Sequence, residues 1–138
     1  MPLPMLIVID TNVALDLLVF DDPGCAALVA ALEAGELQWI AMAAMREEFA
    51  RVLGYPLVAA RLARNGREAT AVLDAFDRRV LLVADAPRAA CLCADPDDQI
   101  FVDLAVAHRA RLFSKDRALL EIRRRLAALG VEVGVPGR

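Results

Sequence analysis

Apolar residues along the chain form short runs that alternate between two patterns. Continuous runs rich in β-branched residues, of which "MLIVI" (residues 5 to 9) is the clearest, are typical of strands buried on both faces of a sheet. Longer segments with apolar residues every three or four positions are typical of helices that pack on such a sheet. Because the two patterns take turns, the sequence predicts an α/β fold with a central parallel sheet and helices on both faces.

The expected elements follow one another without a linker, a repeat or a low-complexity segment. We expect strands over residues 5–9, 37–41, 80–84, 111–114 and 131–135. We expect helices over residues 11–20, 21–35, 44–56, 97–110 and 116–130, with one or two more between 57 and 79. A chain of 138 residues is long enough for one core and short for two, so we treat residues 1–138 as a single domain.

Composition narrows the class of protein. The chain is 59% hydrophobic, but its apolar runs stay well below the roughly 18 consecutive residues of a membrane span, and its start lacks the features of a secretion signal. Together with an odd number of cysteines, three, this predicts a cytoplasmic location. A net charge of −3 argues against a protein that binds nucleic acid through an overall positive charge. Local clusters of arginine, such as Arg123 to Arg125, could still hold a phosphodiester, provided that a divalent cation neutralises a neighbouring acidic pocket.

Three aspartates are expected at one edge of the sheet. Asp10 ends the first strand, Asp116 follows the strand "RLFS" closely, and Asp98 opens a helix two elements away. In parallel sheets, ligands bind at the carboxyl ends of the strands. These three carboxylates, from separate places in the sequence, are therefore expected to converge. Taken singly, each could instead be a helix cap.

Helical geometry adds Glu48 as a fourth acid. At about 100° per residue, the apolar residues of the helix over 44–56 form one stripe, with Glu48 at its border and Glu47 nearly opposite. Glu48 is thus expected to reach over the sheet edge and Glu47 to point into solvent. A surface ion pair is the alternative for Glu48.

The stretch "ADPDDQIFVDLA" (residues 94 to 105) contains four aspartates, and the same geometry sorts them. Asp103 lies about 140° around the helix from Asp98, so the two are not expected to share a site. Asp97 is well placed to cap the helix, and Asp95 before a proline suits a turn. Asp98 remains as the candidate for the pocket.

Three motifs, "IVIDTN", "EEFARVL" and "DPDDQIFVDLAVAHRARLFSKDRALL", occur in an order that resembles the PIN domain family. The resemblance covers nearly the whole chain and is greatest to the family's bacterial VapC-like branch, the toxin components of toxin–antitoxin pairs. The positions that match the family's motifs are Asp10, Asn12, Glu48, Asp98, Ser114 and Asp116. Lys115 is a departure beside the last acid, at a position where the family accepts several residues.

The resemblance implies a three-layer α/β/α sandwich and an endoribonuclease that depends on Mg²⁺ or Mn²⁺. It implies Asp10, Asp98 and Asp116 as direct or water-mediated metal ligands, Glu48 as a ligand or water-orienting group, and Asn12 and Ser114 as residues that position carboxylates or a substrate oxygen. The implied chemistry is in-line attack of an activated water on phosphorus. The implied partners are an RNA substrate, a protein antitoxin and a second copy of the chain.

Three other functions share parts of this pattern. Phosphatases of the haloacid dehalogenase type also place an aspartate after a first parallel strand, but they need a carboxylate two residues on, where this chain has Asn12. Response-regulator receivers expect an acidic pair after the first strand, which a lone Asp10 does not supply. A non-catalytic domain that binds RNA or protein through the same surface is the alternative from a different class.

Overall fold

A computed structural model describes residues 2–137 and shows five parallel strands in one sheet. The strand order is β3-β2-β1-β4-β5, with bounds β1 Met5–Ile9, β2 Leu37–Ala41, β3 Val80–Leu82, β4 Arg111–Phe113 and β5 Val133–Gly134. The register places Met5 opposite Leu37 of β2 and Ile9 opposite Phe113 of β4. Strand β1 is the central strand of the five, and its second half, Ile7 to Ile9, is buried, as expected for a strand covered on both faces, whereas Met5 at its start is exposed.

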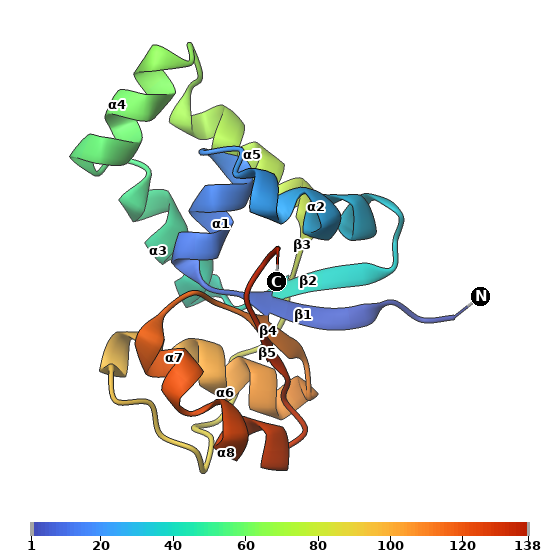
Figure 1. Cartoon of the computed structure of the whole chain (residues 1–138). Coiled ribbons are helices and arrows are strands. Elements are labelled where there is room, and N and C mark those ends of the chain that lie inside the picture. The colour runs from blue at the N-terminus through green and yellow to red at the C-terminus, as the bar shows by residue number, and fades with distance from the viewer. Residues whose placement is uncertain (1, 138) are drawn as a thin grey trace.

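Helices cover both faces of this sheet (Figure 1). The bounds are α1 Thr11–Leu18, η1 Pro23–Cys25, α2 Ala26–Glu33, α3 Ala43–Val52, α4 Pro56–Arg64, α5 Ala69–Arg79, η2 Pro96–Asp98, α6 Gln99–His108, α7 Arg117–Glu121 and α8 Arg123–Ala128. Helices α1 to α5 lie on one side of the sheet, and α6 to α8 lie on the other. The predicted three-layer α/β/α sandwich is confirmed.

The direction of the chain along the sheet reverses next to β1. The connections from β1 to β2 and from β2 to β3 move toward one edge, whereas the connection from β3 through α6 brings the chain back to β4 on the other side of β1. Adjacent parallel strands whose connections leave in opposite directions open a crevice at their carboxyl ends. This switch point lies between the ends of β1 and β4, where Asp10 and Ser114 follow the strands.

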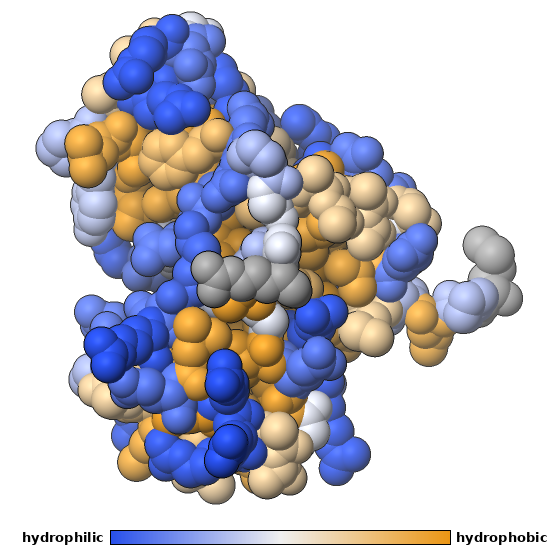
Figure 2. Space-filling model, in the orientation of Figure 1, coloured by the Kyte–Doolittle hydropathy of each residue, from blue (hydrophilic) through white to orange (hydrophobic). Residues whose placement is uncertain are grey.

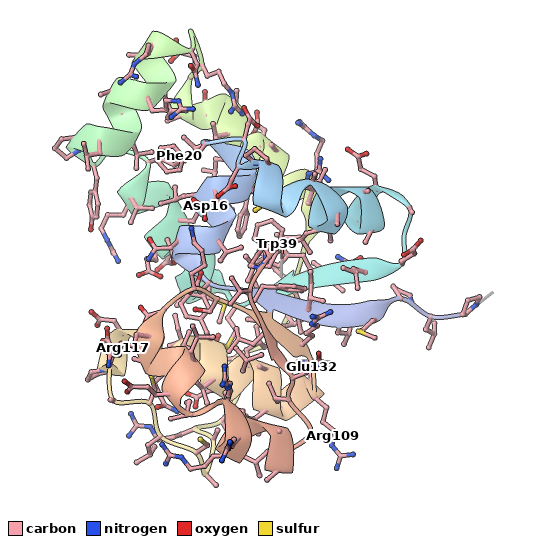
Figure 3. All side chains as sticks on the ribbon, in the orientation of Figure 1. Asp16, Phe20, Trp39, Arg109, Arg117 and Glu132 are labelled. Carbon is pink, nitrogen blue, oxygen red and sulfur yellow. The ribbon has the colours of Figure 1, made fainter. Side chains whose placement is uncertain are left out.

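The core fills both layers around the sheet. Trp39 and Phe49 are 1% exposed, and both rings pack against Phe76 of α5 at centroid distances of 5.1 and 5.0 Å. Figure 3 shows Trp39 inside and Arg117 on the exterior.

On the face in Figure 2, hydrophilic residues gather at the α4 end and over α7 and α8. No helix within residues 2–137 is long and apolar enough to cross a membrane.

Three sequence-based expectations differ from the structure, among them the last strand, which was expected over residues 131–135 and spans only Val133–Gly134. The helix expected over residues 116–130 is divided at Ile122, where no glycine or proline marks the break and a buried side chain holds the bend in the core. The strand expected over residues 80–84 ends at Leu82. It is an edge strand, and Leu81 and Leu82 are about half exposed, so its apolar run did not signal burial on both faces.

Candidate functional site

Asp10 lies at the switch point and is held by the surrounding backbone and side chains. It follows β1, occupies the N-cap of α1 and is only 3% exposed. Its Oδ1 accepts a hydrogen bond from the Val13 amide at 2.9 Å, and its Oδ2 accepts one from the Ser114 hydroxyl at 2.5 Å. Burial raises the pKa of Asp10, although these two hydrogen bonds counteract part of the increase.

Ser114 connects Asp10 to the turn that bears Asp116. The Ser114 side chain is fully buried after β4, and its Oγ also accepts a hydrogen bond from the Asp116 amide at 2.9 Å. Asp116 is the N-cap of α7, where its Oδ1 accepts from the Ala118 amide at 2.8 Å. One hydroxyl therefore fixes the positions of Asp10 and Asp116 relative to each other.

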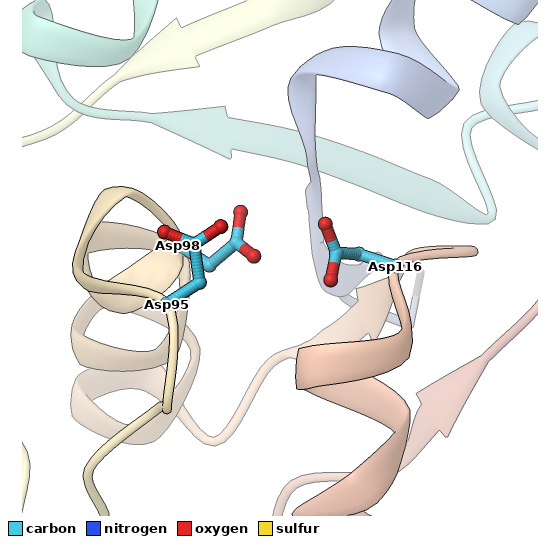
Figure 4. Close-up of side chains that lie close together, drawn as sticks. All are labelled: Asp95, Asp98 and Asp116. Carbon is cyan, nitrogen blue, oxygen red and sulfur yellow. The ribbon is translucent and has the colours of Figure 1, made fainter.

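Asp116 also belongs to a group of three carboxylates, together with Asp95 and Asp98. One carboxylate oxygen from each of Asp95, Asp98 and Asp116 lies within 4.8 Å of the others. In Figure 4, Asp95 and Asp98, from the turn that opens α6, face Asp116 across a short gap. The Oδ2 atom of Asp98 is buried and has no hydrogen-bond donor among residues 2–137. Partial burial, followed by the charges of Asp116 and Asp95, raises the pKa of Asp98 to about 7.

The presence of Asp95 in this group corrects the reading of the stretch "DPDD". Asp97 was expected to cap the helix, but it is exposed, and it is Asp95 that accepts the hydrogen bond of the Asp97 amide at 2.9 Å and so caps the η2 turn. The Asp98 side chain forms no cap. The turn expected at Asp95 is present, but spacing along the sequence gave no sign that its carboxylate would meet that of Asp116.

Glu48 approaches the same edge from α3. Its Oε2 accepts a hydrogen bond from the Thr11 hydroxyl at 2.7 Å, and Thr11 directly follows Asp10. Glu48 is partly buried and Glu47 is exposed, so the expected orientation of this helix is confirmed. Asn12, expected to position a carboxylate or substrate, has an exposed side chain, and Thr11 makes the contact that was missed.

Asp103 has a structural contact away from the carboxylate group, as its position on the helix indicated. Its Oδ1 accepts hydrogen bonds from the Ala89 amide and from Nε2 of Gln99, both at 2.8 Å. Gln99 is 5% exposed, and its Oε1 accepts from the Cys93 amide at 2.7 Å. The two side chains thus attach the segment before Asp95 to α6.

Lys115 also points away from the carboxylate group. Its ammonium forms an ion pair with Asp16 on α1, and this contact raises the pKa of the lysine. The lysine therefore attaches the β4–α7 turn to α1, and no ion pair of the neighbouring Asp116 is present among residues 2–137.

The donor set fits a hard divalent cation. It consists of carboxylate oxygens, which Mg²⁺ and Mn²⁺ prefer, and a buried acceptor atom without a donor is the kind of group that a cation would satisfy. Asp98 and Asp116 can offer carboxylate oxygens directly to a cation. Asp10 is connected to Asp116 by the Ser114 hydroxyl, which donates to Asp10 and accepts from the Asp116 amide. Negative groups held this close repel one another unless protons or cations compensate them. The arrangement can therefore bind a cation next to an anionic substrate.

The chain is similar in sequence to one protein family and in fold to solved structures. The sequence profile of a family described as "PIN domain" matches residues 6–126. A chain of the VapBC2 structure from Rickettsia felis, bound to a DNA fragment from its promoter, is similar over 95% of this chain and 98% of its own, with a TM-score of 0.65 and 12% identity. A PilT N-terminus domain protein from Sulfolobus solfataricus P2 is similar over 95% and 87%, with a TM-score of 0.46 and 14% identity. No curated protein matches the sequence.

Proposed function

The chain belongs to the PIN domain family, and from this premise we propose that it is a Mg²⁺- or Mn²⁺-dependent endoribonuclease, the toxin of a toxin–antitoxin pair. PIN domains are generally nucleases, and they typically bind divalent metals. The observation that carries the proposal is the pair of facing carboxylates of Asp98 and Asp116 beside the buried Asp10 at the switch point, with a buried Asp98 oxygen that has no hydrogen-bond donor among residues 2–137. A site of this kind is incomplete without a cation.

Each residue has a role that follows from its contacts. Asp98 and Asp116 hold the cation directly, and Asp10, whose oxygens already accept two hydrogen bonds, contributes directly or through water. Glu48, oriented by Thr11, holds a proton or a water at the edge of the site. Ser114 holds Asp10 and Asp116 in fixed positions relative to each other.

When bound, a divalent cation supplies an activated water and neutralises charge at the phosphodiester. The protein positions the substrate beside it. Exposed arginines of α7 and α8, Arg117 and Arg123 to Arg125, belong to the helices that follow Asp116, where they can attract an anionic strand. These arginines can therefore attract RNA although the net charge of the chain is −3.

The test is cleavage of mixed single-stranded RNAs in Mn²⁺ by the wild type, Asp98→Ala and Asp97→Ala. Asp97 lies in the same turn but is exposed and outside the carboxylate group, so its variant controls for the loss of one charge. We expect cleavage by the wild type and Asp97→Ala and loss of cleavage in Asp98→Ala. Equal degradation by all three would identify a contaminant, and RNA binding without cleavage by the wild type would identify a binding protein.

The proposal extends to partners. The VapBC2 structure of similar fold is a complex that was solved on promoter DNA, and we infer that this chain too has a protein antitoxin. Exposed apolar side chains at Tyr55 and Leu57, before and in α4, favour self-association into a homodimer. A strictly monomeric mass in light scattering would exclude the homodimer. We place the protein in the cytoplasm, where the free cysteines stay reduced.

A further inference from the structure

The carboxylate of Asp95 is placed in the cation site without being required by the local fold. Its Oδ1 caps the η2 turn by accepting from the Asp97 amide, a bond that an amide or hydroxyl oxygen could accept equally well. Its negative charge therefore adds nothing essential to the turn. That charge instead faces Asp98 and Asp116, which already repel each other, so it costs folding free energy.

The second oxygen of Asp95 is available to a ligand. Within residues 2–137, it has no hydrogen-bond donor, and the neighbouring Oδ2 of Asp98 is buried and equally without one. Two adjacent oxygens of this kind, from residues three apart in one turn, form a pair that a hard cation can bridge. Asp116 completes the group from the opposite side.

The segment that leads to Asp95 is held by hydrogen bonds of the Gln99 side chain. Gln99, 5% exposed, accepts from the Cys93 amide at 2.7 Å and donates to the Cys91 carbonyl at 3.1 Å and to Asp103 at 2.8 Å. The amide and carbonyl groups involved belong to the segment that immediately precedes Asp95. The turn that bears Asp95 and Asp98 is thereby held to the first turn of α6.

We propose that Asp95 is a further cation ligand, which binds the same ion as Asp98 and Asp116. This inference rests on the proposed function and extends it, because the matched motif positions do not include Asp95. It divides the four aspartates at this edge into two kinds. Asp95, Asp98 and Asp116 each place one carboxylate oxygen close to the others, and Asp10, both of whose oxygens accept hydrogen bonds from the protein, contributes directly or through water.

The test compares Asp95→Asn with Asp97→Asn in a Mn²⁺ titration followed by calorimetry and by melting temperature. Both variants remove one charge from the same turn, and Asn at position 95 keeps an oxygen that can cap η2. We expect Asp95→Asn to weaken Mn²⁺ binding about tenfold or more, and Asp97→Asn to leave it within about twofold. Asp95→Ser, which also keeps a capping oxygen, serves as a second variant and should behave like Asp95→Asn.

The outcomes separate this inference from the proposed function. If the wild type binds Mn²⁺ and cleaves RNA while Asp95→Asn binds Mn²⁺ as the wild type does, the role of Asp95 is wrong and the nuclease stands. Equal weakening in Asp95→Asn and Asp97→Asn would also overturn it, because the effect would then be one of general charge. If the wild type does not bind Mn²⁺, both the inference and the proposed function fail.

Discussion

Asp10 and Asp98 lie at the same edge of the sheet, but the protein treats their charges differently. Asp10 is almost fully buried, and each of its oxygens accepts a hydrogen bond, one from Val13 and one from Ser114. Asp98 is partly exposed, has a buried oxygen without a donor in residues 2–137, and faces Asp116. The two hydrogen bonds of Asp10 therefore offset part of the cost of burying its carboxylate, whereas Asp98 has no such compensation within the described chain for its buried oxygen.

The largest effect on stability should come from replacing Asp10. Asp10→Ala takes away the cap of α1 and leaves the buried Ser114 hydroxyl without its acceptor. Relief from burying a carboxylate offsets part of this loss. We expect the free energy of unfolding in urea to fall by about 2 kcal/mol.

Asp10→Asn is the matched control for this change, because it keeps an oxygen for the Val13 amide. Its loss of stability should be smaller than that of the alanine variant. Unfolding of Asp10→Ala at the wild-type urea concentration would show that the hydrogen bonds of Asp10 do not support the fold.

Replacing Asp98 should instead increase the stability of the metal-free protein, and by less than the loss expected for Asp10→Ala. Because the pKa of Asp98 is about 7 in the folded chain and ordinarily near 3.8, the unfolded chain loses this proton first as the pH rises. Its contribution to stability therefore falls between pH 4 and pH 7 and is then constant. We expect Asp98→Asn to melt roughly 3 °C above the metal-free wild type at pH 8, or about 1 kcal/mol, since solvent screens part of the carboxyl.

Two further measurements sharpen this prediction. At pH 4, the difference between Asp98→Asn and the wild type should shrink, because the wild-type carboxyl is then protonated in the folded state. Millimolar Mn²⁺ at pH 8 should stabilise the wild type more than the variant, by mass action on the folded state. A wild type that melts above Asp98→Asn at pH 8 without metal would contradict the pKa assignment.

The sequence predicted the fold and much of the site because the signals involved are local. Apolar runs mark strands, and in a parallel sheet the carboxyl ends of strands meet at one edge, so the convergence of Asp10, Asp98 and Asp116 follows from topology. The orientation of Glu48 follows from helical periodicity alone. These features depend on few tertiary details.

The features that were missed depend on tertiary contacts. The meeting of Asp95 with Asp116 is set by how α6 and α7 pack, which spacing in the sequence does not reveal. The break at Ile122 has no glycine or proline to announce it. The hydroxyl that orients Glu48 comes from Thr11, and only the side-chain geometry distinguishes it from its exposed neighbour Asn12.

The smallest effect on stability should come from Thr11→Val, which removes the hydrogen bond to Glu48 and keeps the shape of the side chain. Water can reach the partly exposed Glu48, so the free energy of unfolding should fall by only about 0.5 kcal/mol. If Glu48 acts only when oriented, Mn²⁺-dependent cleavage should nevertheless fall about tenfold in kcat. Thr11→Ser keeps the hydroxyl and should retain most activity. Equal cleavage by the valine and serine variants would mean that Glu48 acts, if at all, without Thr11, and the role of this acid at the sheet edge would have to be assigned anew.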